Sequence, residues 1–290
     1  MKRIAVIIIS CLLLAGCKSK ANNPVETVDT VETDNNGIGS HICPDGVGII
    51  SIADMENEMS ADLFKGSYDD ELLASLIGEG SFKSSINVFV IYKEGKTVLV
   101  DAGLGSDKGG RLMDKLSSLN INPERIDAVL LTHLHSDHIG GLLNNGQAAF
   151  PNAQLYLSVD EFNAWADGGP LAERNEHWKE VLASYSDKIN LFQDGDTLLD
   201  GLAVAMLAVG HTPGHTVYQV GDVLFIGDLA HAQELQFNHP EFCAKYDGDY
   251  TKAVVSRKRI FNYAQTNHLT VSGAHCFTPF IMSPITIGNI

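Results

Sequence analysis

Short apolar runs that end in polar side chains recur along this chain. The clearest run covers residues 128–132, where five mostly apolar residues suit a buried strand. Four residues with ionisable side chains follow it directly: His133, His135, Asp137 and His138. Residues two apart in an extended segment point the same way, so His133 and His135 can face one place. We therefore expect a strand whose end delivers a group of ligand-type side chains.

The remaining pattern predicts short strands that alternate with helices. Strands are expected over residues 86–92, 97–100, 154–158, 188–192, 203–209, 217–220, 223–226 and 269–272. Helices are expected around residues 112–119, 161–165, 178–184 and 250–266. Part of the stretch 54–80 should be helical and part should lie over the mouth of the site. Hairpins interspersed with helices favour antiparallel or mixed sheets whose outer faces are covered by helices.

The acidic charge of the chain makes nucleic acid an unexpected partner. The formal net charge is −16 at pH 7, and an acidic surface repels phosphate backbones. The composition, with 44% hydrophobic and 19% charged residues among 290, is that of a globular protein with ample material for a core. We interpret the acidity as a source of solubility rather than of a specific interaction.

The first residues have the order of a targeting signal. Lys2 and Arg3 precede an apolar run over residues 4–14, which is too short to span a bilayer and is typical of a secretory signal peptide. Residues 14–17 (Leu-Ala-Gly-Cys) resemble the lipobox of bacterial lipoproteins, in which the cysteine is acylated and becomes the mature N-terminus. An ordinary signal peptide cut nearby is the alternative.

These features divide the chain into three parts. Residues 1–16 are expected to be a lipoprotein signal peptide, and residues 17–46 a lipidated N-terminus followed by a flexible, polar tether. Residues 47–290 are expected to form the folded domain. We expect an exported protein, held on a bacterial membrane by the lipid on Cys17, because two or more acyl chains give stable attachment.

Three cysteines remain in the mature chain: Cys43, Cys243 and Cys276. An odd number cannot pair completely within one chain. A bridge between Cys43 and Cys243 is permitted in an oxidising compartment but cannot be deduced from the sequence. Cys276 is next to His275 and could approach it, although a role as a small buried hydrophobe is favoured.

The spacing of the ligand-type residues favours two metal ions over one. A single catalytic zinc ion keeps one position open for water, so it cannot use His133, His135, Asp137 and His138 together. Further candidates also stand after apolar runs, namely His215, Asp228 and His275. The alternative is a polar loop whose histidines only cap a helix beginning at Ile139.

Together these residues resemble the metallo-β-lactamase superfamily, and the resemblance covers almost everything after Val47. It implies an α+β fold, the αββα sandwich, with mixed sheets, helices on the outer faces and the metals at one edge. It also implies two divalent metal ions, of which Zn²⁺ is favoured. One ion would be held by His133, His135 and His215, the other by Asp137, His138 and His275, and Asp228 would bridge them.

Within that superfamily the chain resembles the methyl parathion hydrolase group. The supporting stretches include residues 150–153 (Phe-Pro-Asn-Ala), 210–216 and 227–231. Related acyl-homoserine lactonases place a substrate-contacting tyrosine where His231 stands. His231 could donate a hydrogen bond to the substrate or the leaving oxygen, or could orient Asp228 instead. The chain also stops fifteen residues beyond His275, which is shorter than this group usually is.

The resemblance implies hydrolysis by a metal-bridging hydroxide, with Asp137, Asp228 and His231 as catalytic residues. A lactone or ester is the favoured small-molecule substrate, with a phosphotriester as a companion or main substrate. A β-lactamase, a glutathione thioesterase and a flavodiiron-type redox scaffold fit less well. An inactive metal-binding surface lipoprotein is the non-enzymatic alternative, and a homodimer is left open.

The other histidines and two aromatic residues are given structural roles. His211 is expected to hydrogen-bond within its Pro-Gly turn rather than to bind metal. Phe162 and Trp165 could line an apolar substrate pocket, but their spacing favours the core. No partner stands at ligand spacing for the remaining four, His41, His177, His239 and His268.

Overall fold

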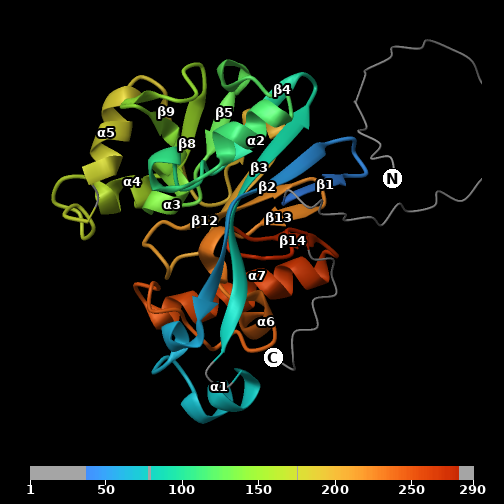
Figure 1. Ribbon diagram of the computed structural model, residues 1–290, viewed down its shortest axis with the longest axis vertical. Coiled ribbons are helices and arrows are strands. Elements are labelled where there is room, and N and C mark those ends of the chain that lie inside the picture. Colours follow the sequence, from blue (N-terminus) through green and yellow to red (C-terminus); the bar gives the residue numbers. More distant parts are fainter. Residues whose placement is uncertain (1–36, 78–79, 175, 281–290) are drawn as a thin grey trace, which may run out of the picture. The chain divides into compact units, whose positions relative to one another are not determined.

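Two β-sheets form the centre of the domain (Figure 1). The computed structural model describes residues 37–77, 80–174 and 176–280. The larger sheet has seven strands, in the order β1 (Ile38–Ile42), β2 (Gly48–Ser60), β3 (Ser81–Lys93), β4 (Lys96–Val100), β5 (Ala128–Leu130), β8 (Gln154–Ser158) and β9 (Ile189–Phe192). The smaller sheet has five, in the order β10 (Thr197–Leu198), β11 (Ala203–Leu207), β12 (Thr216–Val220), β13 (Val223–Phe225) and β14 (Thr270–Ser272). A separate hairpin pairs β6 (Leu143–Asn144) with β7 (Gln147–Ala148).

Both large sheets are mixed. The strands from β1 to β4 pair antiparallel, whereas β4, β5, β8 and β9 pair parallel. In the smaller sheet β10 to β13 are antiparallel and β14 joins parallel to β13. The parallel strands β4, β5, β13 and β14 therefore end in the same direction within their sheets, which brings the loops after them to one edge.

The core between the two sheets is apolar and closely packed. Buried side chains from β3, β4 and β5 meet those from β11, β12 and β13 in one cluster. The rings of Phe89 and Phe225 lie 4.9 Å apart across this interface. The buried hydroxyl of Tyr218 donates a hydrogen bond of 2.6 Å to the carbonyl of Leu131, which links the smaller sheet to the chain just before the histidines.

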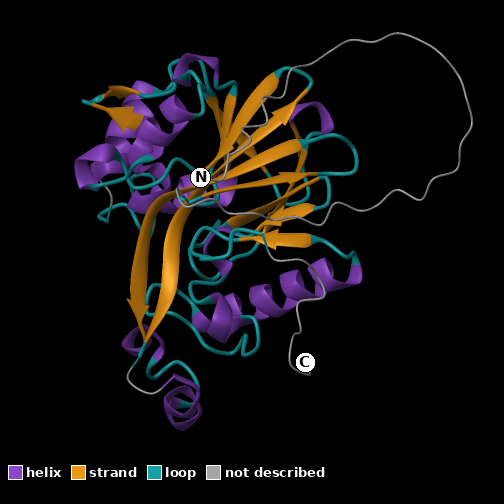
Figure 2. Ribbon diagram, turned by 45° about the vertical axis from the view of Figure 1, so that its right-hand side comes forward, coloured by secondary structure: helices purple, strands orange, loops and turns teal. Residues whose placement is uncertain are grey.

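Helices cover the outer faces, as Figure 2 shows. The larger sheet packs against α2 (Leu112–Ser118), α4 (Val159–Trp165) and α5 (Glu176–Ser184), and the smaller sheet packs against α7 (Tyr250–Thr266). The end of β2 and the start of β3, with Met59 and Phe82, pack with α1 (Asp70–Ile77) and α6 (Gln233–Gln236) in a further cluster. The remaining helix is α3 (Ser136–Ile139), and the 3₁₀ turns are Ala61–Phe64, Ser106–Lys108, Pro123–Arg125, Gly140–Leu142, Leu199–Gly201 and Gly227–Leu229. The α+β, αββα architecture predicted from the resemblance is confirmed.

The structure corrects the start of the folded domain. Strand β1 begins at Ile38 and pairs with β2 over its whole length, so residues 38–42 belong to the sheet, and residues 43–47 are the turn that leads into β2. Residues 38–46 are therefore part of the folded domain and not of the tether assigned to residues 17–46. The expectation that part of residues 54–80 is helical is confirmed by the 3₁₀ turn Ala61–Phe64 and by α1, while residues 54–60 continue strand β2. The sequence did not predict strand over residues 54–60, because polar residues interrupt the apolar alternation there. The signal peptide and the lipidated Cys17 lie outside the described residues.

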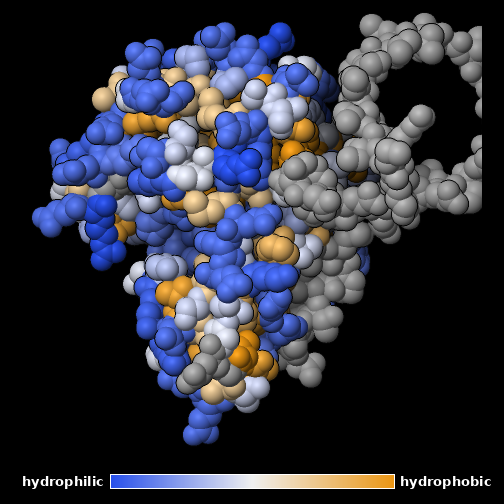
Figure 3. Space-filling view, in the orientation of Figure 1, coloured by the Kyte–Doolittle hydropathy of each residue, from blue (hydrophilic) through white to orange (hydrophobic). Residues whose placement is uncertain are grey.

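The cysteines of the folded domain lie in its interior. Cys43, Cys243 and Cys276 are free and buried, so the bridge between Cys43 and Cys243 is not formed, and Cys276 packs in the apolar cluster under α7. Hydrophilic side chains dominate the face shown in Figure 3, with apolar ones scattered among them. In the described part of the chain, no helix combines the length and the apolar content that crossing a bilayer requires.

We expect Phe225→Ala to lower the free energy of unfolding by about 3–5 kcal/mol, because it empties a fully buried aromatic site between the sheets. Val255→Ala on α7 is the control, since Val255 is 62% exposed and its truncation should change stability by less than about 0.5 kcal/mol. Urea denaturation of both variants measures the difference. Equal losses would contradict a packed core at this position.

Candidate metal centre

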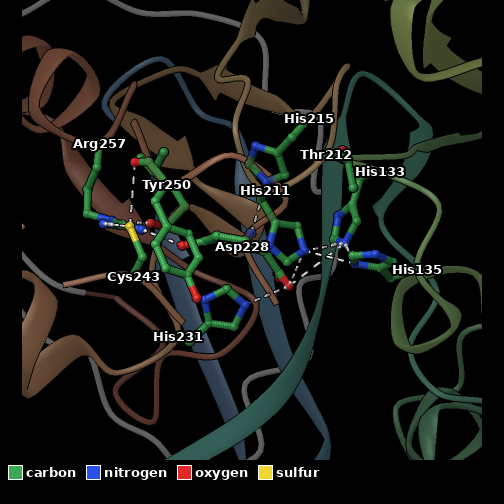
Figure 4. A network of polar contacts seen from close by, with 12 residues as sticks. His133, His135, His211, Thr212, His215, Asp228, His231, Cys243, Tyr250 and Arg257 are labelled. Carbon is green, nitrogen blue, oxygen red and sulfur yellow. Dashed lines mark hydrogen bonds and ion pairs between the residues drawn. The ribbon is translucent and has the colours of Figure 1, made fainter. Parts of the chain in front are cut away.

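The candidate site lies at the edge where loops from both sheets meet. Strand β5 leads into residues 131–135 and then α3, which together carry the His133 to His138 motif. The loop between β11 and β12 supplies His211, and the segment after β13 supplies Asp228. Figure 4 shows the side chains from these loops pointing toward one another around Asp228. His275 follows β14 and reaches the same place.

Three ring nitrogens converge in the first group. His133 Nε2 lies 2.9 Å from His135 Nδ1, which lies 2.8 Å from His211 Nε2, and His211 Nε2 lies 3.2 Å from His133 Nε2. Ligands of a tetrahedral zinc ion with bonds of about 2.0 Å would be separated by about 3.3 Å. Three ring nitrogens at this spacing cannot all hydrogen-bond to one another. Each nitrogen carries either one proton or one lone pair, so at least one of the three pairs must bring together two donors or two acceptors. The donor set therefore fits a cation.

A second group lies on the other side of the Asp228 carboxylate. Asp228 Oδ1 is 3.0 Å from His138 Nε2 and 3.3 Å from His275 Nε2, while Asp137 Oδ2 is 3.5 Å from His275 Nε2. Asp228 Oδ2 faces the first group, at 3.2 Å from His211 Nε2. His138 Nε2 and Asp228 Oδ1 are buried without a hydrogen-bond partner, which is costly unless a cation binds there. The cluster thus fits two metal ions with Asp228 between them.

Hydrogen bonds behind the histidines fix the direction of their free nitrogens. His133 Nδ1 donates to Thr132 Oγ1 at 3.1 Å, and the Thr132 hydroxyl donates to Asp101 Oδ2 at 2.8 Å. His138 Nδ1 donates to the same Asp101 oxygen at 2.7 Å. His275 Nδ1 donates to the Ser85 carbonyl at 2.9 Å. In each case Nε2 is left facing the cluster, the arrangement found behind metal-bound histidines.

His211 is supported in the same way from α7. Its Nδ1 donates to Asp247 Oδ1 at 3.0 Å, and Asp247 pairs with the buried guanidinium of Arg257 at 3.2 Å. Gly210 lies directly against that helix, since a Cβ there would come within 2.2 Å of the Ala253 nitrogen. The loop consequently turns at Gly210, where φ is 137°, and directs His211 inward.

The structure corrects the choice between the two histidines of this loop. His215 Nδ1 donates to the Ala208 carbonyl at 3.2 Å, and its Nε2 accepts from the Asp228 backbone N–H at 3.0 Å. Both nitrogens are therefore occupied, and His215 supports the Asp228 backbone instead of facing the cluster. His211, expected to bond only within its own turn, takes the position given to His215. The sequence alone could not show which of the two histidines faces the cluster, because both lie in one Pro-Gly loop.

The other predicted site residues lie where the sequence placed them. His133, His135, Asp137, His138, Asp228 and His275 all belong to the two groups. His231 lies 3.2 Å from Asp228 Oδ2 through its Nε2 and stacks on the His275 ring at 5.2 Å. Neither His231 nitrogen makes a hydrogen bond of good geometry, although Nε2 is within ion-pair distance of Asp228, and the side chain lines the cavity. Asp101 and Asp247 were missed, although Asp101 also follows an apolar strand.

Burial and charge set the protonation states of the cluster. Burial lowers the pKa of His133 well below its usual value, and burial with His211 nearby lowers the pKa of His135 to about 3. Burial opposes the charge on His138, yet Asp228 and Asp101 raise its pKa well above normal. Burial likewise opposes ionisation of Asp228, but His138 and His275 outweigh it and hold its pKa far below normal. Neutral His133 and His135 beside an ionised Asp228 are the states that bind metal.

A cavity of about 610 Å³ opens over the cluster. Its wall combines the metal-ligand candidates with Trp165, which is also packed in the core, and with Met59 from the end of β2. Phe162 packs on Trp178 instead, with the two rings 6.3 Å apart. The remaining lining residues are Asn57, Ile86, Ser136, Arg174, Lys245 and Tyr246. The volume is within the range of small-molecule sites.

We expect His211→Ala to bind one metal ion fewer than the unmodified protein, because it removes one of three converging nitrogens. His215→Gln is the matched comparison: it should retain both ions, since His215 faces backbone groups and glutamine can still accept from the Asp228 N–H. Elemental analysis after metal loading and gel filtration measures both. Loss of an ion in His215→Gln with full retention in His211→Ala would show that His215, and not His211, binds the metal.

Comparisons with known proteins agree with this geometry. Residues 83–265 match the family model of the metallo-beta-lactamase superfamily. The hydroxyacylglutathione hydrolase of Aeromonas salmonicida (strain A449) is 31% identical over 146 residues, which are 49% of this chain and 45% of that protein. The exodeoxyribonuclease WalJ of Streptococcus pneumoniae serotype 2 is 43% identical over 68 residues, 23% of either protein. The chain spans about half the length of the hydroxyacylglutathione hydrolases that it matches.

Solved structures extend the likeness over most of the chain. The hydrolase AbOPH of the beta lactamase superfamily superposes with a TM-score of 0.75 at 29% identity, covering 85% of this chain and 93% of that one. AidC, a dizinc quorum-quenching lactonase, superposes with a TM-score of 0.71 at 22% identity, covering 88% and 100%. The fold, the histidine and carboxylate cluster and the family match lead to one conclusion: this chain belongs to the metallo-β-lactamase superfamily.

Proposed function

We propose that this protein is a dinuclear metal-dependent hydrolase acting on lactone or ester substrates. The observation that carries the proposal is the position of the Asp228 carboxylate, with Oδ2 toward His211 and Oδ1 toward His138 and His275. Two bound divalent cations, of which Zn²⁺ is favoured, would activate water and polarise the scissile carbonyl. No serine or cysteine nucleophile is needed, and the three free cysteines are buried.

Each residue of the cluster has a task in this proposal. His133, His135 and His211 would hold the first ion, and Asp137, His138 and His275 the second. Asp228 spans both groups and Asp137 borders the cavity, so both carboxylates can orient the attacking water. His231 can donate a hydrogen bond to the leaving oxygen, since its side chain lines the cavity and neither nitrogen makes a well-aligned hydrogen bond within the protein.

The cavity and the structural neighbours favour a lactone or simple ester. Its wall offers Met59, Ile86, Trp165 and Tyr246, which suit an apolar acyl group. AidC, which shares the fold, was solved with a homoserine product of a lactone. A phosphotriester is the second candidate, because the same two-cation chemistry applies to a phosphoryl oxygen. A hydroxyacylglutathione thioester is the third, on the strength of the match to that hydrolase over half its length.

We expect Asp228→Ala to abolish turnover while the far-ultraviolet circular dichroism stays native, because the residue bridges both groups. His231→Gln should retain metal but lower kcat by about 10²-fold, in line with loss of proton donation to a leaving group. The assay compares lactones, aryl esters, aryl phosphotriesters, β-lactams and glutathione thioesters with the metal-loaded protein. Full activity of Asp228→Ala would reject the bridging role, and activity confined to phosphotriesters or thioesters would change the substrate class.

We also propose that the chain is exported and anchored through a lipid on Cys17, on the basis of residues 1–17. In a bacterial host, Cys17→Ser should move the protein from the membrane fraction to the soluble exported fraction and remove labelling by a palmitate analogue. Cys43→Ser, which changes a buried cysteine of the folded domain, is the control and should leave both unchanged. Membrane attachment that survives Cys17→Ser would exclude lipidation at this residue.

A further inference from the structure

The Glu161 carboxylate is fully buried, and its hydrogen bonds run to residues that neighbour the first group of histidines. Its Oε1 accepts from the Leu134 backbone N–H at 3.1 Å and from the Trp165 indole N–H at 2.6 Å. Its Oε2 accepts from the Thr212 hydroxyl at 2.6 Å and from the Gly214 backbone N–H at 2.9 Å. Four donors from three separate segments therefore meet on one carboxylate.

Three of the four donors belong to the two loops that present the first group, and the fourth, the Trp165 indole, is on α4. Leu134 lies between His133 and His135, while Thr212 directly follows His211. One oxygen of Glu161 therefore fixes the segment of two converging nitrogens, and the other fixes the segment of the third. The three nitrogens keep mutual distances of 2.8 to 3.2 Å, although His211 comes from the other sheet.

The same carboxylate also reaches the wall of the cavity. Trp165, whose indole donates to Glu161, lines the cavity and meets the His135 ring edge-on, with the ring centroids 5.6 Å apart. A change in the position of Trp165 would therefore be transmitted to the Leu134 segment through one shared oxygen. The cavity wall and the first metal position are not independent of each other.

The local sequence indicates a more ordinary use of this glutamate. Ser158 caps α4 by accepting from the Glu161 backbone N–H at 3.1 Å, and Ser-x-x-Glu is the pattern of a capping box. In a capping box the glutamate side chain returns to the backbone of the cap residue. Here both oxygens are instead used by Leu134, Trp165, Thr212 and Gly214, so the side chain serves the ligand loops rather than its own helix.

Only an acceptor with two ionised oxygens suits this position. All four partners are donors, and a carboxylate is acceptor-only at both oxygens. A glutamine would direct its amide hydrogens at one pair of donors. The Thr212 hydroxyl can rotate to accept, but the N–H groups of Leu134 and Gly214 and the Trp165 indole cannot. At least one buried N–H donor of a ligand loop would then lose its acceptor.

We propose that Glu161 is the positioning residue of the first metal site: it holds the His133–His135 segment and the His211 loop at the spacing a cation requires and joins both to Trp165. The inference rests on the proposed two-metal site. It extends that site to a residue outside the metal-ligand groups, through which changes in the cavity wall reach metal binding.

The test is a calorimetric titration of the metal-free proteins with Zn²⁺. The unmodified protein should show two binding steps, and the step missing in His211→Ala identifies the first site. Glu161→Gln should weaken that step by about 10–100-fold, as is usual when support behind a ligand is lost, and should change the other step by a much smaller factor. Thr212→Val, which removes one donor and keeps the carboxylate, should weaken the same step by a smaller factor.

Tyr185→Phe is the matched control for loss of a buried polar group. Its hydroxyl bonds to the Leu142 carbonyl and the Phe150 N–H in the helical layer, away from the cluster. It should lower the melting temperature without altering either binding step. Absence of metal binding in the unmodified protein would refute the proposed function itself. Two native steps in Glu161→Gln, or in Thr212→Val if Glu161→Gln does not fold, would overturn the positioning role alone.

Discussion

The convergence of histidine ring nitrogens on buried carboxylates is the constraint on which this structure depends. Three histidine nitrogens lie 2.8 to 3.2 Å from one another. His138 Nε2 and Asp228 Oδ1 are buried and make no hydrogen bond of good geometry, although they are 3.0 Å apart. Such an arrangement is unfavourable in an apolar interior unless cations fill it. Much of the surrounding structure can be understood as the scaffold that holds these groups together until a metal binds. Hydrogen-bond acceptors behind the rings leave four of the histidines few other orientations: His133, His138, His211 and His275.

Both sheets are needed to build this cluster. His133, His135, Asp137 and His138 follow a strand of the larger sheet, whereas His211, Asp228 and His275 come from loops of the smaller one. Buried hydrogen bonds join the two sides at several places. They include the Tyr218 hydroxyl on the Leu131 carbonyl and the Glu161 carboxylate on both ligand loops. Packing of Phe89 on Phe225 supplies the apolar part of the same connection.

The sequence predicted the fold class and most of the candidate cluster, because the signals were local. Apolar runs followed by histidine or aspartate gave six of the ligand positions, and hydrophobic spacing gave the helices α2, α4, α5 and α7. His211 was missed because the choice between it and His215 depends on which side chain meets Asp247 and which meets the Asp228 backbone. Glu161 was equally hidden, since its sequence context is that of a helix cap. Contacts between distant segments decide both cases.

Asp101 has a consequence for the way the two positions fill. One of its oxygens accepts from His138 of the second group and from the Thr132 hydroxyl that supports His133 of the first. The two sites thus share a single anion as a common support. When the first ion binds, it also orders Asp101, and this cost is not paid again when the second ion binds. The affinities of the two sites are therefore linked, and the linkage is reciprocal. Titration curves of such a pair are those of an interacting system rather than of two separate sites.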